Sequence, residues 1–135
     1  MPSNVKLGNA AVSAQADTLA RLLDDGYLRI YSGLQPSSCN TPVTTQILLA
    51  ELRITSPSAQ RAVNGVITIT FHPDKDVSAT GQATWYRMLA ADGVTPLLDG
   101  TAGEAETDDL VFDSASLQIH AQLAISGYKH TVPKS

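Results

Sequence analysis

The chain has 135 residues, of which 43% are hydrophobic and 16% charged, and these values predict one folded domain with a lightly charged surface. Its net charge of −4 argues against nucleic-acid binding, because that function needs a basic surface to displace counterions. No apolar run approaches the ~20 residues of a membrane helix, and the first residues lack a signal-peptide pattern, so we expect no membrane partner.

Residues 1–9 are predicted to form an irregular arm that leads into the only helix of the chain. Asn9 is a candidate N-cap, and Gly26 is a candidate C′ residue for a helix over residues 10–25. Apolar residues at helical spacing predict a narrow, Ala-rich stripe that packs against a sheet or a neighbouring subunit. These residues are Val12, Ala16, Leu19, Leu22 and Leu23.

Three strands are expected in the first 71 residues, before the central stretch described next. Residues 27–31 form the first, and Ser32-Gly33 ends it. Residues 46–54 form the second, because the run is short and prolines at positions 42 and 57 bracket it. A polar loop with two prolines lies between them at residues 35–42. After a loop over residues 56–64 and a turn at Asn64-Gly65, residues 66–71 form a β-branched third strand, which a charged loop follows.

The central stretch, residues 79–100, has the period of two that is typical of a strand. Trp85 and Arg87 fall on one face with Ala83 and Leu89, whereas Thr84, Tyr86, Met88 and Ala90 fall on the other. Asp92-Gly93 is then expected to form a tight turn, and residues 94–98 to return as a partner strand. Since Pro96 cannot donate to a ladder, this strand is expected at an edge, ended by a turn at Asp99-Gly100.

The last third contains a short strand at residues 110–112, inside a stretch with seven carboxylates between positions 92 and 113. Residues 116–126 alternate, and residues 128–135 read as a basic tail. About seven short strands with Gly, Pro and Asx turns predict a mainly β fold, a β-sandwich with one N-terminal α-helix; jelly-roll and immunoglobulin-like orders both stay open. In residues 116–126 we expect Leu117, Ile119, Ala121, Leu123 and Ile125 to face inward, and Ser116, Gln118, His120 and Gln122 to face water.

No catalytic, metal or cofactor site is predicted, so we expect a protein that is not an enzyme. Cys39 cannot form an internal disulfide, which suggests a reducing cytoplasm, and with no nearby histidine it is expected to be unreactive. His72, His120 and His130 lack zinc-ligand spacing and are expected at the surface. The carboxylates near Thr107-Asp108-Asp109 match no EF-hand loop and are expected to form a solvated acidic edge.

Aromatic residues are the remaining candidates for function. Trp85, Tyr86, Tyr31 and Tyr128 are predicted to anchor the core or a protein interface. Adjacent aromatic residues also occur in sugar-binding surfaces, so a carbohydrate-binding module stays open as an alternative. A glycoside hydrolase is disfavoured, because no aromatic cluster accompanies the paired carboxylates.

Several strings along residues 10–133 together resemble a family of small virion proteins encoded by tailed bacteriophages and their prophages. Two features depart from the family pattern. Residues 101–113 are more acidic than the usual Gly/Ser/Asn-rich loop of the family, and the loop that contains Cys39 and two prolines is particular to this sequence. The strings follow an Ala-rich helix and are L-R-I-Y-S-G-L-Q-P (28–36), Q-I-L-L-A-E-L (46–52), A-T-G-Q-A-T-W-Y-R-M-L-A-A-D-G (79–93), L-L-D-G (97–100) and T-V-P (131–133).

The resemblance implies a structural component of the virion, made in the host cytoplasm. The role expected from it is a capsid cement or decoration protein that binds the major capsid protein at the capsid surface and stabilises the head. It also implies a homo-oligomer, expected to be a trimer at three-fold or quasi-three-fold positions. A tail or head–tail joining component is an alternative of the same class, and a carbohydrate-binding adhesion module is one of a different class.

Overall fold

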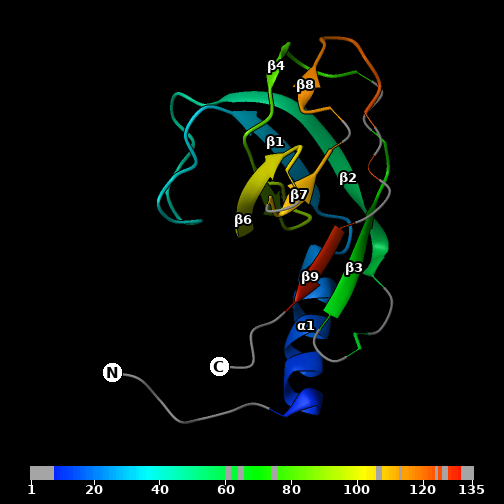
Figure 1. Ribbon diagram of the computed structural model, residues 1–135. Coiled ribbons are helices and arrows are strands. Elements are labelled where there is room, and N and C mark those ends of the chain that lie inside the picture. The colour runs from blue at the N-terminus through cyan, green and yellow to red at the C-terminus, as the bar shows by residue number, and fades with distance from the viewer. Residues whose placement is uncertain are drawn as a thin grey trace.

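The computed structural model describes residues 8–59, 62–63, 66–73, 76–105, 108–112, 114–123, 125 and, for the backbone alone, 128–131 (Figure 1). The fold is mainly β with one N-terminal α-helix, as predicted. The elements among these residues are α1 (Asn9–Leu23), β1 (Tyr27–Ser32), β2 (Ile47–Ala59), β3 (Val66–Phe71), β4 (Gly81–Gln82), β5 (Trp85–Leu89), β6 (Pro96–Gly103), β7 (Leu110–Val111), β8 (Ser116–Leu117) and β9 (Tyr128–Thr131).

Seven strands form one curled sheet in the order β7-β6-β5-β1-β2-β3-β9, and β4 pairs with β8 in a separate ladder. Strand β2 joins the two parts of the sheet. Its first residues pair with β1, from Ser32↔Ile47 to Tyr27↔Arg53, and its last pair with β3 at Ala59↔Ile69. A register shift between Ile54 and Ala59 separates these ladders. Figure 1 shows the resulting curl, with β4 and β8 at one end and α1 at the other.

One hydrophobic core fills the inside of the curl and includes residues from α1, the sheet and the chain after β7. Alternate residues of β1 and β5 point into it, namely Leu28 and Ile30 from β1 and Tyr86 and Met88 from β5. Each of these four side chains is fully buried. Their neighbours along the strands therefore lie on the outer face of the sheet, which positions the candidate site described below.

The helix packs on β2 and β3 through most of the stripe expected from its sequence. Leu22 is an exception, because it was predicted to lie in the stripe but is 52% exposed. Val12, Ala16, Ala20 and Leu23 are buried at helical spacing. The predicted ends of the helix were wrong by one or two residues, because Gly8 rather than Asn9 is the N-cap and the helix ends at Leu23. No helix in the described part of the chain is long and apolar enough to cross a membrane.

Gly26 does not end the helix through a left-handed conformation, as the sequence suggested. Asp25 has the positive φ, at 58°. A Cβ on Gly26 would collide with the backbone carbonyl of Leu89 at the end of β5. Position 26 therefore needs glycine for a close approach of two backbones, and not for its φ angle.

Strand β2 continues to Ala59, where the sequence predicted a loop from residue 56. Pro57 lies inside the register shift between β2 and β3, where the ladder is interrupted, so no ladder hydrogen bond is lost. Ser58 is fully buried there and ties β2 to the helix: its amide donates to Asp24 Oδ1 at 2.7 Å, and its hydroxyl donates to the Ala20 carbonyl at 2.6 Å.

The return strand after Asp92-Gly93 is longer than predicted, and Asp99-Gly100 is not a turn. Both residues lie inside β6, where Gly100 is opposite Tyr86. A Cβ on Gly100 would collide with the Tyr86 hydroxyl and ring, so this glycine is required by packing. The edge expected for residues 94–98 holds for that stretch, because β5 is the one described strand that pairs with Pro96 and Leu98. Strand β7 pairs in parallel with Ala102 and Gly103, beyond the predicted strand, so β6 as a whole is not the last strand of the sheet. Pro96 opens β6 at a position that suits proline.

Among the described residues of the alternating run at 116–126, the structure has only the two-residue strand β8. The alternation ends at His120, which has a φ of 68°, and Ile119 is 48% exposed instead of inward. Leu117 is buried, and Ala121, Leu123 and Ile125 pack against the core as predicted. Residues 128–131 of the predicted tail form β9, paired with β3. Residues 1–7 of the predicted arm, Asn64-Gly65 and residues 132–135 lie outside the described residues.

Candidate functional site

The outer face of the sheet carries two rows of side chains across four adjacent strands. Residues directly opposite in a ladder share a face, so the register defines each row. We call Tyr31, Trp85, Arg87 and Asp99 the outer cluster. One row runs Leu48–Tyr31–Trp85–Thr101 and the next runs Glu51–Arg29–Arg87–Asp99, both from β2 through β1 and β5 to β6.

The second row is a line of charges in which two arginines stand side by side between two carboxylates. Like charges directly opposite destabilise a sheet, and each arginine has its own carboxylate to offset this. Arg87 Nε and Nη2 donate to the two oxygens of Asp99 at 2.7 and 2.9 Å. Arg29 Nε donates to Glu51 Oε2 at 2.7 Å.

The two ion pairs differ in exposure to water. The Arg87 and Asp99 side chains are each 6% exposed, whereas those of Arg29 and Glu51 are 28% and 38% exposed. The hydrogen bonds that Arg87 donates to Asp99 hold the pKa of the Arg87 guanidinium above its ordinary value. A buried bidentate pair of this kind fixes the geometry of both strands.

The aromatic part of the outer cluster is equally enclosed. The Tyr31 and Trp85 rings stack with centroids 4.5 Å apart at 14°, and the Arg87 guanidinium lies 5.4 Å from the Trp85 ring. Trp85 is fully buried and Tyr31 is 5% exposed. Among the described residues, Trp85 Nε1 is the one buried side-chain nitrogen or oxygen without a hydrogen-bond partner.

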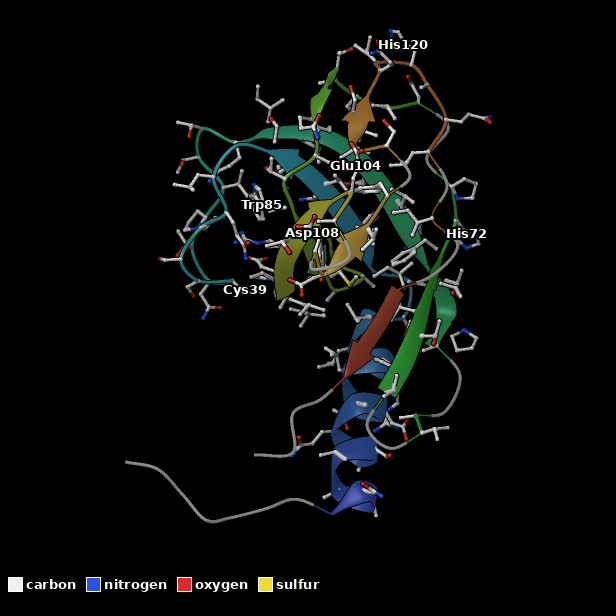
Figure 2. The ribbon with its side chains drawn as sticks, viewed as in Figure 1. Cys39, His72, Trp85, Glu104, Asp108 and His120 are labelled. Carbon is white, nitrogen blue, oxygen red and sulfur yellow. The ribbon has the colours of Figure 1, made fainter. Side chains whose placement is uncertain are left out.

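The segment between β1 and β2, residues 33–46, covers the outer cluster, and we call it the strap. Thr84, just before β5, and Arg87, within β5, both contact the strap: Thr84 Oγ1 donates to the Gly33 carbonyl at 2.7 Å, and Arg87 Nη2 donates to the Ser38 carbonyl at 3.4 Å. Burial and the neighbouring Asp99 raise the pKa of the Cys39 thiol in the strap to about 11. Figure 2 shows Trp85 and Cys39 on the side of the sheet where the strap runs.

Three of the four predicted aromatic anchors are buried. Tyr31 and Trp85 meet in the outer cluster, and Tyr86 lies on the opposite face, in the core. Tyr128 belongs to β9, but its side chain lies outside the described residues. The structure therefore brings two of these residues together and separates them from the third by the thickness of the sheet.

The histidines and carboxylates considered for metal binding do not converge in the described part of the chain. No group of three or more His, Cys, Asp or Glu side chains there can hold a metal ion. His72 is exposed, and His120 is exposed and pairs with Asp76 through Nδ1 at 2.7 Å. The side chain of His130 and the whole of Thr107 lie outside the described residues.

Two carboxylates of the acidic stretch serve to build the local loop. Asp109 Oδ2 accepts a hydrogen bond from the Thr101 amide at 2.9 Å, which ties the start of β7 to β6. Asp108 Oδ2 accepts from the Ala105 amide at 3.2 Å. A Cβ on Gly103 would collide with the Asp108 carboxylate, so this glycine makes room for the loop.

Sequence reasoning missed the Arg87–Asp99 pair, although a signal for it was present. Arg87 and Asp99 are equidistant in sequence from Gly93, whose φ of 71° marks the hairpin turn. Residues equidistant from a hairpin turn oppose each other, and this places an arginine against a carboxylate. The pairing was missed because the predicted turn at Asp99-Gly100 ended the return strand before Asp99.

The outer cluster is built to hold the strap and strands β1, β5 and β6 together, because its charged and aromatic groups point at one another and away from solvent. A comparison of the chain with protein families, with curated proteins and with solved structures finds no match. The functional conclusion therefore depends on the residues themselves and on the resemblance of the sequence strings.

Proposed function

We propose that the chain is a non-enzymatic structural protein of a bacteriophage virion, a cement or decoration protein that binds the major capsid protein and stabilises the head. The observation that carries this proposal is how the strings of the family resemblance lie in the fold. Residues 28–36, 46–52, 79–93 and 97–100 supply β1, the start of β2, β5 and the middle of β6. These four strands are adjacent in the sheet, and three of them, β1, β5 and β6, supply the outer cluster. The resemblance thus covers one continuous structural unit.

Exposed apolar side chains at the ends of the strap support a protein partner. Leu34 is 83% exposed and Ile47 is 56% exposed. They lie near each other, because Leu34 accepts a hydrogen bond from Gln46 Nε2 at 2.6 Å and Ile47 is next to Gln46 in sequence. Apolar side chains of this kind form the buried centre of protein interfaces. Under this proposal they contact the capsid protein, and copies of the chain assemble as a trimer around a symmetry axis.

Immunogold electron microscopy of purified phage particles tests the location. Label over the head is expected from the proposal. Label confined to the tail or neck would instead assign the chain to a joining structure, and particles without the protein would refute a virion role.

Binding of the purified chain to heads that lack it tests the contact surface. Leu34→Asp is expected to abolish binding without unfolding the chain, because Leu34 has few neighbours to lose. Val111→Asp is a matched control, since Val111 is also exposed, at 49%, but lies on β7. Equal binding by Leu34→Asp and the natural chain would show that the strap end is not the contact.

Burial argues against the carbohydrate-binding alternative. Trp85 has no exposed ring face to stack on a sugar, since Tyr31 and the strap cover it. Trp85→Ala is therefore expected to lower the free energy of unfolding by ~3–5 kcal/mol, as truncation of a core aromatic does. A denaturant titration measures this loss of stability. If Trp85→Ala instead keeps the stability of the natural chain but loses glycan binding on an array, that result would support the carbohydrate-binding module. The finer fold assignment, a β-sandwich with jelly-roll or immunoglobulin-like strand order, stays a prediction.

A further inference from the structure

The strap is a separate layer over the outer cluster. No residue of the strap belongs to the hydrophobic core cluster, and many of its side chains are exposed, including Leu34 at 83%. Yet the groups beneath it are enclosed: Trp85 is fully buried and Arg87 is 5% exposed. A thin polar cover over a large aromatic and charged surface has little apolar area of its own to hold it in place.

Few hydrogen bonds hold the strap closed. Gln46 Nε2 donates to the Leu34 carbonyl at 2.6 Å, and Gln46 Oε1 accepts from the Thr44 amide at 3.0 Å. Towards the sheet, Thr84 holds the Gly33 carbonyl at 2.7 Å, and the contact from Arg87 to Ser38 is long, at 3.4 Å. Gln46 therefore joins the two ends of the strap, and Gly33, with a φ of 93°, is its first residue.

The closed strap covers a polar group that has no hydrogen-bond partner among the described residues, which destabilises the closed state. Trp85 Nε1 is buried without a hydrogen-bond partner in the described part of the chain. A buried unsatisfied donor costs about 1–3 kcal/mol relative to a hydrated one. Water that enters when the strap lifts would satisfy this donor, so the cost falls on the closed state alone.

The sheet itself does not depend on the strap. The Arg87–Asp99 pair links β5 to β6, and the Tyr31–Trp85 stack links β1 to β5. The β1–β2 ladder begins at Ser32↔Ile47, at the two ends of the strap. All of these contacts lie within the sheet, so they persist when residues 34–45 move away.

We propose that the strap, residues 33–46, opens and closes as a unit on the intact sheet, and that opening brings Trp85 and the Arg87–Asp99 pair into contact with water. Gln46 acts as the latch, because it joins the two ends of the strap. This property belongs to the chain alone and is independent of the proposed virion role.

Hydrogen exchange of the Trp85 indole N–H tests the proposal in the unmodified chain. Trp85 is the only tryptophan, so it gives a single indole resonance in a ¹⁵N-correlated NMR spectrum. If the strap opens locally, the indole proton exchanges with a much weaker denaturant dependence than the core amides of β1 and β5, because little surface is exposed. An indole proton whose denaturant slope equals that of the core amides would overturn the proposal.

Removing the latch tests the role of Gln46. Gln46→Ala deletes both of its hydrogen bonds, and indole exchange is expected to accelerate roughly five- to tenfold while core amide exchange changes less. Gln15→Ala is the matched control, since Gln15 is exposed on α1 and remote from the strap. Equal indole exchange in Gln46→Ala and Gln15→Ala would overturn the assignment of the latch, and the measurement on the natural chain stands even if a variant folds poorly.

Discussion

Removing the carboxylate of Asp99 is the most direct test of how the outer cluster stabilises the fold. The Arg87 side chain is 6% exposed, and its guanidinium makes two hydrogen bonds to this carboxylate. In Asp99→Ala it stays buried with its charge uncompensated, and breaking a buried pair in this way costs ~3–5 kcal/mol. Since the stability of a domain is about 5–15 kcal/mol in total, the loss is a large part of it.

The exposed pair on the same face provides the control. Glu51 accepts the same 2.7 Å hydrogen bond from Arg29, but these side chains are 28% and 38% exposed. An exposed ion pair contributes about 0–1 kcal/mol, so Glu51→Ala is expected to lose ~1 kcal/mol or less. Guanidinium unfolding followed by far-UV circular dichroism gives both values. The argument from burial is refuted if Asp99→Ala is no less stable than Glu51→Ala.

The remaining predictions concern packing, reactivity and pH. Gly100→Ala is expected to lower the free energy of unfolding by ~1–3 kcal/mol through overpacking against Tyr86, and an unchanged thermal midpoint would contradict this. Cys39, with its pKa raised from 9.0 to about 11, is expected to react with iodoacetamide at pH 8 ~100-fold more slowly than in the unfolded chain; a native rate within tenfold would contradict it. Hydrogen bonds from Thr95, above all from its hydroxyl, lower the pKa of Asp92 from 3.8 to about 2, so its stabilising effect is present above pH ~4 and is lost as the pH falls towards 2. The stability difference between the natural chain and Asp92→Asn, measured by urea unfolding, should therefore shrink over that interval, and a constant difference would speak against the assignment.

Local spacing was enough to predict the elements whose signal is repeated along the chain. Val12, Ala16 and Leu23 gave the buried stripe of α1, and the alternation around Trp85 gave β5. The turn at Asp92-Gly93 was also predicted, because one glycine with a positive φ is a local requirement. In each of these cases the residues that determine the structure lie within a few positions of one another.

Features that depend on distant partners were not predicted. Gly100 looks like a turn residue until Tyr86 is placed over it, and Gly26 looks like a helix end until β5 is placed beside it. Pro57 appeared to end a strand, but the register shift against β3 accommodates it. The burial of Trp85 was open for the same reason, since the cover comes from the strap between β1 and β2.

The central position of β1 has a consequence for how the chain folds. Strands β1 and β2 are consecutive and can pair early as a hairpin, but the other edge of β1 is completed only by β5, from the second half of the sequence. Closing so long a loop slows folding, and sheets dominated by distant pairings form in milliseconds to seconds. Until β5 arrives, the hairpin presents an unpaired edge that includes Leu28 and Ile30, and an edge of this kind can pair with another copy. A nascent chain at high concentration is therefore exposed to aggregation at this edge during folding, and insertion of β5 is the step that ends that exposure.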